Sequence, residues 1–310
     1  GLQFKGGIFT NLTHEHLDYH KTFKEYRDTK KIFFDSLTES SFALINADDK
    51  NAKVMVQNCK AKTYTYALHR YANFSTQVLE NQFKGMLLKI NQHEIWTQML
   101  GEFNAYNILA VYATTQLLDQ DEWESLKAIS QLKTVPGRFQ TFETPNNIMV
   151  VVDYAHTPDA LLKTLECLKN ENKKNISIVF GCGGDRDKKK RPLMAKIANK
   201  YCSKIYITDD NPRNEDPQKI RKELLKYIPR KKSFNIGNRR SAIQQSIKQA
   251  IPGETILVAG KGHEEIQIYK NKIYKISDKK IIKGTATKSK YLSKKKINYF
   301  ENNLILQKIM

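Results

Sequence analysis

Long apolar runs are absent from this chain of 310 residues, and cysteine is scarce. No stretch approaches the ~20 consecutive apolar residues of a transmembrane helix, so we expect no membrane span. The first residues do not have the pattern of a secretory signal. The four cysteines are Cys59, Cys167, Cys182 and Cys202, and no two of them form a C-x-x-C pair. This spacing excludes a cysteine zinc site and a disulfide framework, and it indicates a reducing, cytoplasmic setting.

Three common motifs of catalysis and nucleotide binding are also missing. The sequence has no H-E-x-x-H, which excludes a zincin site, and no G-x-x-x-x-G-K-[ST] phosphate-binding loop. Residues 181–184 read G-C-G-G, but this is not the G-x-G-x-x-G of a dinucleotide site, and Asp185 would repel a pyrophosphate. Small residues at this position instead let the backbone approach a ligand closely.

Acidic residues are outnumbered, with 32 Asp and Glu against 52 Lys and Arg, a net charge of +20. Such a charge suits nucleic acid, an anionic membrane surface or polyanionic substrates. The lysines are spread along the whole chain, which indicates a compositional bias rather than one binding stripe. We expect a solvated or weakly ordered basic tail at 286–310. A nucleic-acid arm is the alternative for this tail, and nucleic acid is otherwise not an expected partner.

The second half of the chain alternates between predicted strands and helices. The predicted strands are 148–152, 176–180, 205–208 and 255–258. The helices predicted among them are 158–168, 192–201, 217–227 and 240–249, followed by a hairpin at 266–276. This alternation is typical of a doubly wound α/β domain.

The first half is predicted to be a separate α/β domain. Its predicted elements are a strand starting at Phe9, a helix at 23–37, a strand at 41–46, a β-rich stretch at 62–100, and helices at 104–118 and 122–132. The turn V-P-G-R at 135–138 marks the boundary. We therefore expect domains at 1–137 and 138–285.

Charged residues follow three predicted strands of the second domain. They are Arg186 after the first, Asp210 and Arg213 after the second, and Glu264 after the third. Loops at the carboxyl ends of parallel strands converge on one crevice. Arginine forks hold carboxylates and acids hold ammonium groups, so this set suits a zwitterion. A mutual salt-bridge network without a ligand is the alternative.

Three other clusters have both a functional and a structural interpretation. The histidines and acids within 14–20 either bind a metal or form a polar loop. Asn104 and Asn107 either cap a helix start or read an adenine through their amides. Asp153 at a strand end is placed for a ribose hydroxyl, and His156 with the following helix N-terminus for phosphate. A simple cap on that helix is the alternative.

Taken in order, these segments resemble the Mur ligases, ATP-dependent amide-forming enzymes of peptidoglycan synthesis, and most closely those that add the third peptide residue. The matching motifs are F-T-N-L-T (9–13), H-L-D-Y-H (16–20), F-N-A-Y-N (103–107), G-R (137–138), D-Y-A-H-T-P (153–158), G-C-G-G-D-R-D (181–187), R-P-L-M (191–194), D-N-P-R (210–213) and G-K-G-H-E (260–264). The resemblance implies part of a central ATPase domain followed by a Rossmann-like C-terminal domain that binds the incoming amino acid.

The resemblance also implies residue roles. His16 would be a Mg²⁺ ligand, and Lys30 would be carbamylated, becoming a second, anionic ligand. His156 would act with them in catalysis. Around ATP the resemblance places Asn104, Asn107, Arg138, Asp153 and His156. Around meso-diaminopimelate it places Arg186 and Arg213 on the distal carboxylate, Asp210 and Glu264 on the ammonium, Asn211 bridging, and Gly260.

The implied reaction joins meso-diaminopimelate to UDP-MurNAc-L-Ala-D-Glu through an acyl phosphate, with ATP and Mg²⁺ as cofactors. The phosphate-binding loop and UDP-binding domain of the family would precede residue 1. We therefore expect a truncated record, a shortened protein or half of a split one, inactive alone, and either monomeric or paired with the missing portion. The alternative within the same superfamily is a folylpolyglutamate synthetase. Such an enzyme would lack the D-N-P-R and G-K-G-H-E motifs that this sequence contains together, which disfavours it. The alternative of another class is a non-catalytic scaffold that uses its basic surface on nucleic acid or a partner protein.

Overall fold

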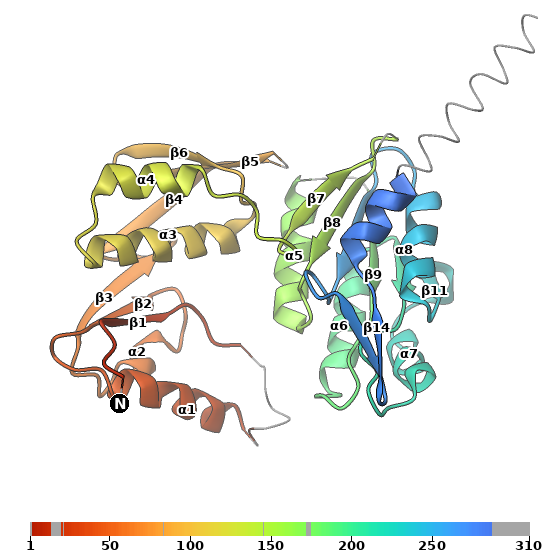
Figure 1. Cartoon of the computed structure of the whole chain (residues 1–310), viewed down its shortest axis with the longest axis horizontal. Coiled ribbons are helices and arrows are strands. Elements are labelled where there is room, and N and C mark those ends of the chain that lie inside the picture. The colour runs from red at the N-terminus through yellow and green to blue at the C-terminus, as the bar shows by residue number, and fades with distance from the viewer. Residues whose placement is uncertain are drawn as a thin grey trace, which may run out of the picture. The chain divides into compact units, whose positions relative to one another are not determined.

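A computed structural model describes residues 2–13, 20, 22–82, 84–144, 146–171 and 175–286. The chain forms two compact units, Gly1–Thr134 and Val135–Met310 (Figure 1). Both units combine helices with a sheet that contains parallel strands, which confirms the predicted α/β class. The domain limits 1–137 and 138–285 stay a prediction, and almost all of the expected tail lies outside the described residues. Within the described part, no helix is long and apolar enough to cross a membrane.

The first unit has a six-stranded sheet in the order β1-β2-β3-β4-β5-β6. Its parallel strands are β1 (Gly6–Phe9), β2 (Phe42–Asn46), β3 (Lys62–Ala67) and β4 (Phe74–Gln82). The antiparallel extension is β5 (Gly85–Ile90) and β6 (His93–Thr97). β1 ends at Phe9, so the prediction of a strand starting at that residue was wrong. The helices are α1 (Phe23–Asp35), α2 (Ala52–Met55), α3 (Glu102–Leu117) and α4 (Glu122–Ser130).

Strand β2 is buried on both faces, which explains its unbroken apolar sequence. Ala43 and Ile45 join the cluster formed with α1 and α2, whereas Leu44 joins the cluster formed with α3 and α4. Helix α1 begins at a cap, because the hydroxyl of Thr22 accepts a hydrogen bond of 3.1 Å from the N–H of Glu25. The helices thus cover the sheet of this unit from both sides.

The second unit has a six-stranded sheet in the order β11-β10-β9-β12-β8-β7. Its parallel strands are β8 (Met149–Asp153), β9 (Ile176–Phe180), β10 (Lys204–Ile207), β11 (Ser233–Asn235) and β12 (Thr255–Ala259), and β7 (Gln140–Glu143) is antiparallel. The helices are α5 (Pro158–Glu171), α6 (Lys190–Tyr201), α7 (Pro217–Leu225), the 3-10 turn η1 (Arg230–Lys232) and α8 (Arg239–Lys248). A hairpin of β13 (Ile266–Tyr269) and β14 (Lys272–Lys275) follows.

The winding of this sheet reverses between β9 and β12. From β9 the chain moves outward through β10 to β11, and α8 then carries it back to β12 on the other side of β9. Helix α8 and the helical residues 278–286 pack on one face of the sheet, while α5 and α6 lie together on the other (Figure 1). Ligands of open α/β sheets bind at such a switch point, outside the carboxyl ends of the strands.

Candidate functional site

The loops after β9, β10 and β12 contact one another, as expected for carboxyl ends that flank the switch point. The N–H of Gly184 donates to the carbonyl of Asn211 at 2.9 Å. The ammonium of Lys261 donates to the side-chain oxygen of Asn211 at 3.0 Å. A Cβ on Gly184 would overlap the carbonyl oxygen of Pro212, so glycine is needed where the first two loops meet.

Arg213 and Arg186 lie close together across Gly183. A Cβ built on Gly183 would be 3.0 Å from NH1 of Arg213 and 3.8 Å from Cγ of Arg186. Arg213 has the left-handed φ of +50° and donates to the carbonyl of Gly184 at 2.7 Å. Its backbone bonds to Ile268 and Lys270 attach this loop to the β13–β14 hairpin. The partners of Arg213 are therefore neutral carbonyls, and its charge is available to an anionic ligand.

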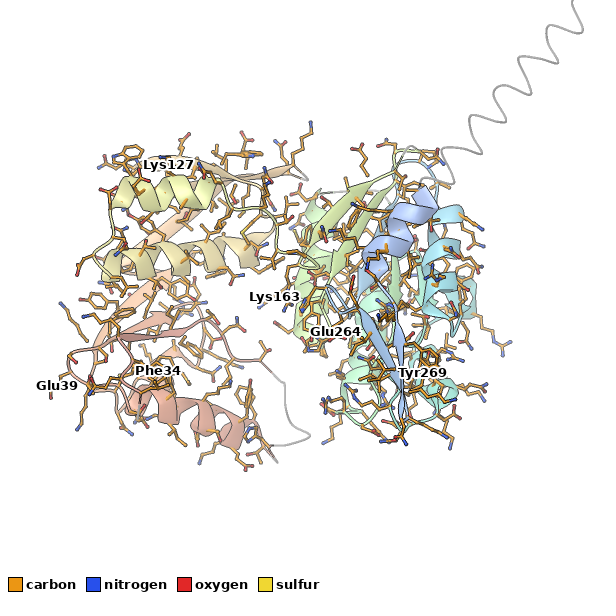
Figure 2. All side chains as sticks on the ribbon, viewed as in Figure 1. Phe34, Glu39, Lys127, Lys163, Glu264 and Tyr269 are labelled. Carbon is orange, nitrogen blue, oxygen red and sulfur yellow. The ribbon has the colours of Figure 1, made fainter. Side chains whose placement is uncertain are left out.

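Glu264 is held by three donors from three different segments. One carboxylate oxygen accepts from the hydroxyl of Tyr154 at 3.0 Å, and the other accepts from the amide of Asn211 at 3.3 Å and the ammonium of Lys261 at 3.4 Å. Asp210 lies on the same ammonium, at 3.8 Å. Glu264 is shown in Figure 2, together with Tyr269 of the hairpin. Two carboxylates and the guanidinium of Arg213 thus meet at one end of the sheet, and the exposed side chain of Arg186 begins beside them.

Asn211 was expected to bridge to the ligand, but its side chain bonds to other parts of the protein. Its side-chain oxygen accepts from Lys261 and from the N–H of Ile268, both at 3.0 Å, and the residue is buried. The polar atoms of Asn211 therefore join the loop after β10 to the loop after β12. A direct contact with the ligand stays a prediction.

A buried ion-pair network supports the loop that carries Arg213. Arg191 is fully buried in α6 and donates to Glu215 at 2.8 Å and to Glu223 at 2.8 Å. Burial raises the pKa of Glu215, but hydrogen bonds from Arg191 and from the N–H of Asp185 outweigh this and lower it to about 2. Glu215 therefore stays ionised and connects the loops after β9 and β10.

Asp153, Arg138 and His156 surround Tyr154 at the end of β8. Both oxygens of Asp153 accept backbone N–H groups, from Phe139 at 2.7 Å and Ala155 at 2.8 Å, so this carboxylate braces the turn. The guanidinium of Arg138 lies 4.3 Å from the centre of the Tyr154 ring. The Nδ1–H of His156 donates to the carbonyl of Tyr154 at 2.9 Å. Burial, together with the nearby carboxylate of Glu264, raises the pKa of Tyr154, so its hydroxyl keeps its proton.

In the first unit, Asn104 and Asn107 bond to each other at 3.3 Å. The amide of Asn104 is buried and donates to the carbonyl of Leu100 at 2.6 Å. The helix cap is Gly101, at a φ of +87°, so the alternative that Asn104 is the N-cap was wrong. Asn107 is exposed one turn further along α3. Asn104 thus has a structural role in addition to any contact with a nucleotide.

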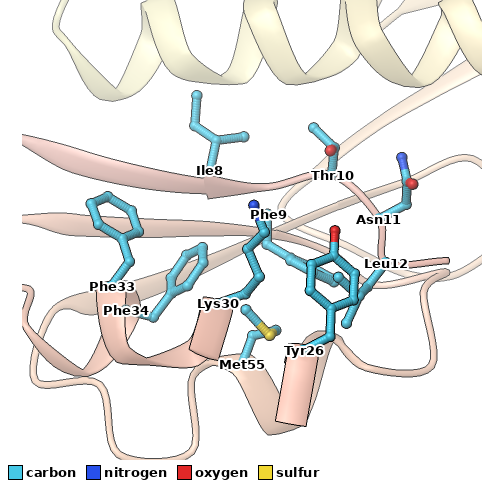
Figure 3. Close-up of a pocket in the computed structure, with 10 residues that line it drawn as sticks. All are labelled: Ile8, Phe9, Thr10, Asn11, Leu12, Tyr26, Lys30, Phe33, Phe34 and Met55. Atoms are coloured by element: carbon cyan, nitrogen blue, oxygen red, sulfur yellow. The ribbon is translucent and has the colours of Figure 1, made fainter. Parts of the chain in front are cut away.

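Lys30 lines a cavity of about 360 Å³ between α1 and β1. Figure 3 shows its ammonium directed from α1 toward β1, with the hydroxyl of Tyr26 directed toward Thr10. His16, the other predicted metal ligand, lies outside the described residues. Within the described part, no three His, Cys, Asp or Glu side chains group as a metal site. Among the predicted site residues that the structure describes, Lys30, Asn104 and Asn107 belong to the first unit and the others to the second.

Sequence analysis missed Lys261, Tyr154 and Arg191, which hold the predicted residues in place. All three belong to motifs that it quoted. A lysine between two glycines just after a buried strand, as in G-K-G, is one signal that Lys261 is enclosed by the fold. Lys261 and Glu264 are three residues apart, so this contact is local. Nothing in the sequence shows that Tyr154 reaches Glu264 or that Arg191 reaches Glu215, because these partners are far apart along the chain.

The fold and the site define an α/β protein with two parallel-sheet units, the second of which presents a zwitterionic set of side chains at its switch point. Family models match both units: the Mur ligase middle domain over residues 1–115, and the Mur ligase glutamate ligase domain over residues 137–262. The chain belongs to the Mur ligase family.

Named relatives agree with this assignment. The chain is 48% identical over 289 residues to a UDP-N-acetylmuramoyl-L-alanyl-D-glutamate–2,6-diaminopimelate ligase of Cytophaga hutchinsonii, covering 91% of this chain and 59% of the relative. It is 47% identical over 288 residues to the ligase of the same name from Bacteroides fragilis, with 91% and 59% covered. The chain thus spans about 59% of the length of these curated relatives.

Solved structures show the same fold. A UDP-N-acetylmuramoyl-L-alanyl-D-glutamate–2,6-diaminopimelate ligase matches with a TM-score of 0.59 and 31% identity, covering 93% of this chain and 61% of that one. MurF ligase from Thermotoga maritima, in complex with ADP, matches with a TM-score of 0.65 and 16% identity, covering 83% and 58%. The second match, at this low identity, supports the fold alone.

Proposed function

We propose that this chain supplies the acceptor site in ATP-dependent addition of meso-diaminopimelate to UDP-MurNAc-L-Ala-D-Glu. The observation that carries the proposal is the pair Arg186 and Arg213 across Gly183, beside Asp210 and Glu264. The names of the similar ligases support it. A cytoplasmic location, a monomeric state and pairing with a further portion stay predictions.

The charge pattern suits the distal end of diaminopimelate. That end carries both an ammonium and a carboxylate, whereas lysine carries only an ammonium there. Arg213 bonds to neutral carbonyls, so a carboxylate ligand would be its first anionic partner. Lysine would leave this guanidinium desolvated without compensation, which disfavours it. Glu264 and Asp210 would receive the ammonium.

The proposed chemistry has two steps. An oxygen of the D-glutamyl γ-carboxylate attacks the γ-phosphorus of ATP, and ADP leaves. The amine of diaminopimelate then attacks the acyl carbon, loses a proton, and inorganic phosphate leaves. Holding the amine near the acyl carbon is the contribution of the acceptor loops, because orientation alone lowers such barriers strongly.

The cationic and hydrogen-bonding groups around Tyr154 fit a nucleotide phosphate. They are Arg138, His156 and the N-terminal end of α5, where the hydroxyl of Thr157 caps the N–H of Ala160 at 3.2 Å. Asn104 and Asn107 stay predictions for adenine, and Asp153 for ribose. We propose that Mg²⁺ binds near His16 and carbamylated Lys30, where it would offset phosphate charge.

Calorimetric titration of the chain with meso-diaminopimelate and with L-lysine tests the proposal. We expect binding of meso-diaminopimelate and weaker binding of lysine. Arg213→Ala should weaken diaminopimelate binding by about 10- to 100-fold, because it removes a charged hydrogen bond of roughly 1.5–3 kcal/mol. Arg230→Ala, on the exposed turn η1, is the matched control and should bind as the wild type does. Equal affinity of the chain for the two amino acids would contradict the proposal.

A further inference from the structure

Lys261 is a fully buried ammonium at the centre of the acceptor loops. Its side chain is 0% exposed. The ammonium donates to the carbonyl of Ile266 at 2.7 Å, to the side-chain oxygen of Asn211 at 3.0 Å and to Glu264 at 3.4 Å. These three bonds use its three protons, and Asp210 lies 3.8 Å away on the same ammonium. Lys261 therefore contacts both acids of the proposed site and has no proton left for a ligand.

The backbone around Lys261 has little freedom to move. Gly260 and Gly262 on either side have φ values of +107° and +54°, which favour glycine. A Cβ on Gly262 would lie 2.5 Å from the carbonyl oxygen of Gly137 and 2.9 Å from the Cβ of Tyr154. A Cβ on Gly260 would lie 2.9 Å from a carboxylate oxygen of Asp210. The loop thus presents Lys261 to both acids in one defined position.

The two acids face few other charges. Glu264 faces the hydroxyl of Tyr154 and the amide of Asn211, and the ring of His263 lies 5.5 Å from that of Tyr154. The buried guanidinium of Arg239 acts on both acids from a greater distance, but it is paired with Asp278 at 2.7 Å. Arg213 donates to backbone carbonyls, and Arg138 lies over the ring of Tyr154. Without Lys261, two partly buried carboxylates would therefore stand together with no paired cation among the described residues. Like charges held side by side repel each other, which favours protonation of one of the two carboxylates.

We propose that Lys261 is a positioning residue that keeps Asp210 and Glu264 both ionised and side by side, leaving them one net negative charge for the ammonium of the incoming amino acid. The net charge follows from two carboxylates and one ammonium. A site of that charge matches one ammonium of the ligand. The inference rests on the proposed function for the identity of the ligand, but not for the charge state of the two acids.

Lys261→Met tests this inference, because methionine has a similar length but no charge. The first measurement is the affinity for meso-diaminopimelate between about pH 6 and about pH 8.5. The variant should bind about tenfold or more weakly at the acidic end, because one acid is protonated and a charged hydrogen bond is lost. The deficit should shrink as the pH rises and that acid ionises. Taking the ratio of variant to wild-type affinity removes the contribution of His156 and His263.

The second measurement needs no ligand. Carboxyl ¹³C resonances of Asp210 and Glu264, assigned through Asp210→Asn and Glu264→Gln, report protonation directly. We expect one of them to titrate near neutral pH in Lys261→Met and neither to do so in the wild type. If Lys261→Met does not fold, Lys261→Met/Glu264→Gln provides the test. Removing the excess acid should then restore folding, whereas a purely structural role of Lys261 would leave the double variant unfolded.

Lys204→Met is the matched control. Lys204 is the first residue of β10, so it lies at the amino end of the strands, opposite the end that carries Lys261. Its ammonium pairs at 3.0 Å with the buried carboxylate of Glu254. This variant should lose stability without any pH-dependent change in diaminopimelate binding. Unchanged carboxyl titrations in Lys261→Met would overturn the inference. Altered titrations in a chain that does not bind diaminopimelate would overturn the proposed ligand and leave the role of Lys261 intact.

Discussion

Arg191 and Glu215 show how single residues support a ligand site without facing it. Arg191 is buried, and two acids compensate its charge. Glu215 in turn accepts the N–H of Asp185 at 2.8 Å, at the tip of the loop after β9. One carboxylate thus positions the loops of both Arg186 and Arg213. Hydrogen bonds of this kind, to charged groups in a partly buried setting, are stronger than neutral ones.

Acid titration of Glu215 should be visible in the stability of the chain. Its pKa falls from 4.5 to about 2 on folding, so the ionised form is favoured in the folded state. The resulting stabilisation, about 3 kcal/mol, is present above pH 4.5 and is lost as the pH falls toward 2. Glu215→Gln should therefore be less stable than the wild type at neutral pH, and the difference should narrow below pH 4.5. Urea unfolding of both proteins at a series of pH values measures this difference in the free energy of unfolding.

The control for this prediction is Glu143→Gln, at an exposed position on β7. It should change stability little across the same pH range. A Glu215→Gln variant whose deficit stays constant on acidification would show that the carboxylate is not the source of the pH dependence.

At the scale of elements, the loop after β12 is defined by backbone contact. Gly262 has a φ of +54° and lies against Gly137 and Tyr154, in the turn between β12 and the hairpin. Gly137 is equally crowded, because a Cβ there would overlap the N–H of His263. Two glycines far apart in sequence therefore let two turns cross at the site. The close contact between these two turns fixes the backbone from which the side chains of the G-K-G-H-E motif extend.

Gly262→Ala should destabilise the second unit by about 1–3 kcal/mol, because alanine is strained at positive φ and its methyl group collides with Gly137. Diaminopimelate binding should weaken as well, since Lys261 and Glu264 flank the same turn. Denaturant unfolding and calorimetry measure the two effects. Gly284→Ala is the matched control: Gly284 lies in the helical residues 278–286 with no heavy atom within 4 Å of an added Cβ. It should be neutral or slightly stabilising, and equal effects of the two substitutions would refute the argument.

At the scale of the whole molecule, the two units have separate cores and separate sheets. The proposed acceptor residues all belong to the second unit. Both tryptophans, Trp96 and Trp123, belong to the first unit. Fluorescence therefore reports the unfolding of the first unit, whereas calorimetry reports both.

Meso-diaminopimelate should raise the unfolding temperature of the second unit alone. A ligand at about 100 times its dissociation constant adds about 2.7 kcal/mol to the unit that binds it. We expect the calorimetric transition of the second unit to move upward while the tryptophan transition stays in place. L-lysine at the same concentration is the control and should move the transition of the second unit by less, since it binds more weakly. A joint shift of both signals would show that the units unfold as one.

The sequence by itself determined the α/β class and the succession of elements in the second unit. Periodic apolar runs bounded by turn residues are local properties, so strands such as β9 and β12 were predicted almost to the residue. The short β7, β11 and α2 were missed, because three or four residues carry too little periodicity. The convergence of three charged loops was also predictable, because parallel strands place their carboxyl ends at one edge.

Only the tertiary structure decided what each polar side chain is used for. Asp153 braces a turn, Asn211 joins two loops, and Lys261 takes up part of the charge of Asp210 and Glu264. Asp153 bonds to backbone groups, and Lys261 is about fifty residues from Asn211 and Asp210, so no local pattern records these contacts. Only the contact between Lys261 and Glu264, three residues apart, is local. Hydrogen bonds and charges depend on distance in space, and folding alone brings those atoms within reach.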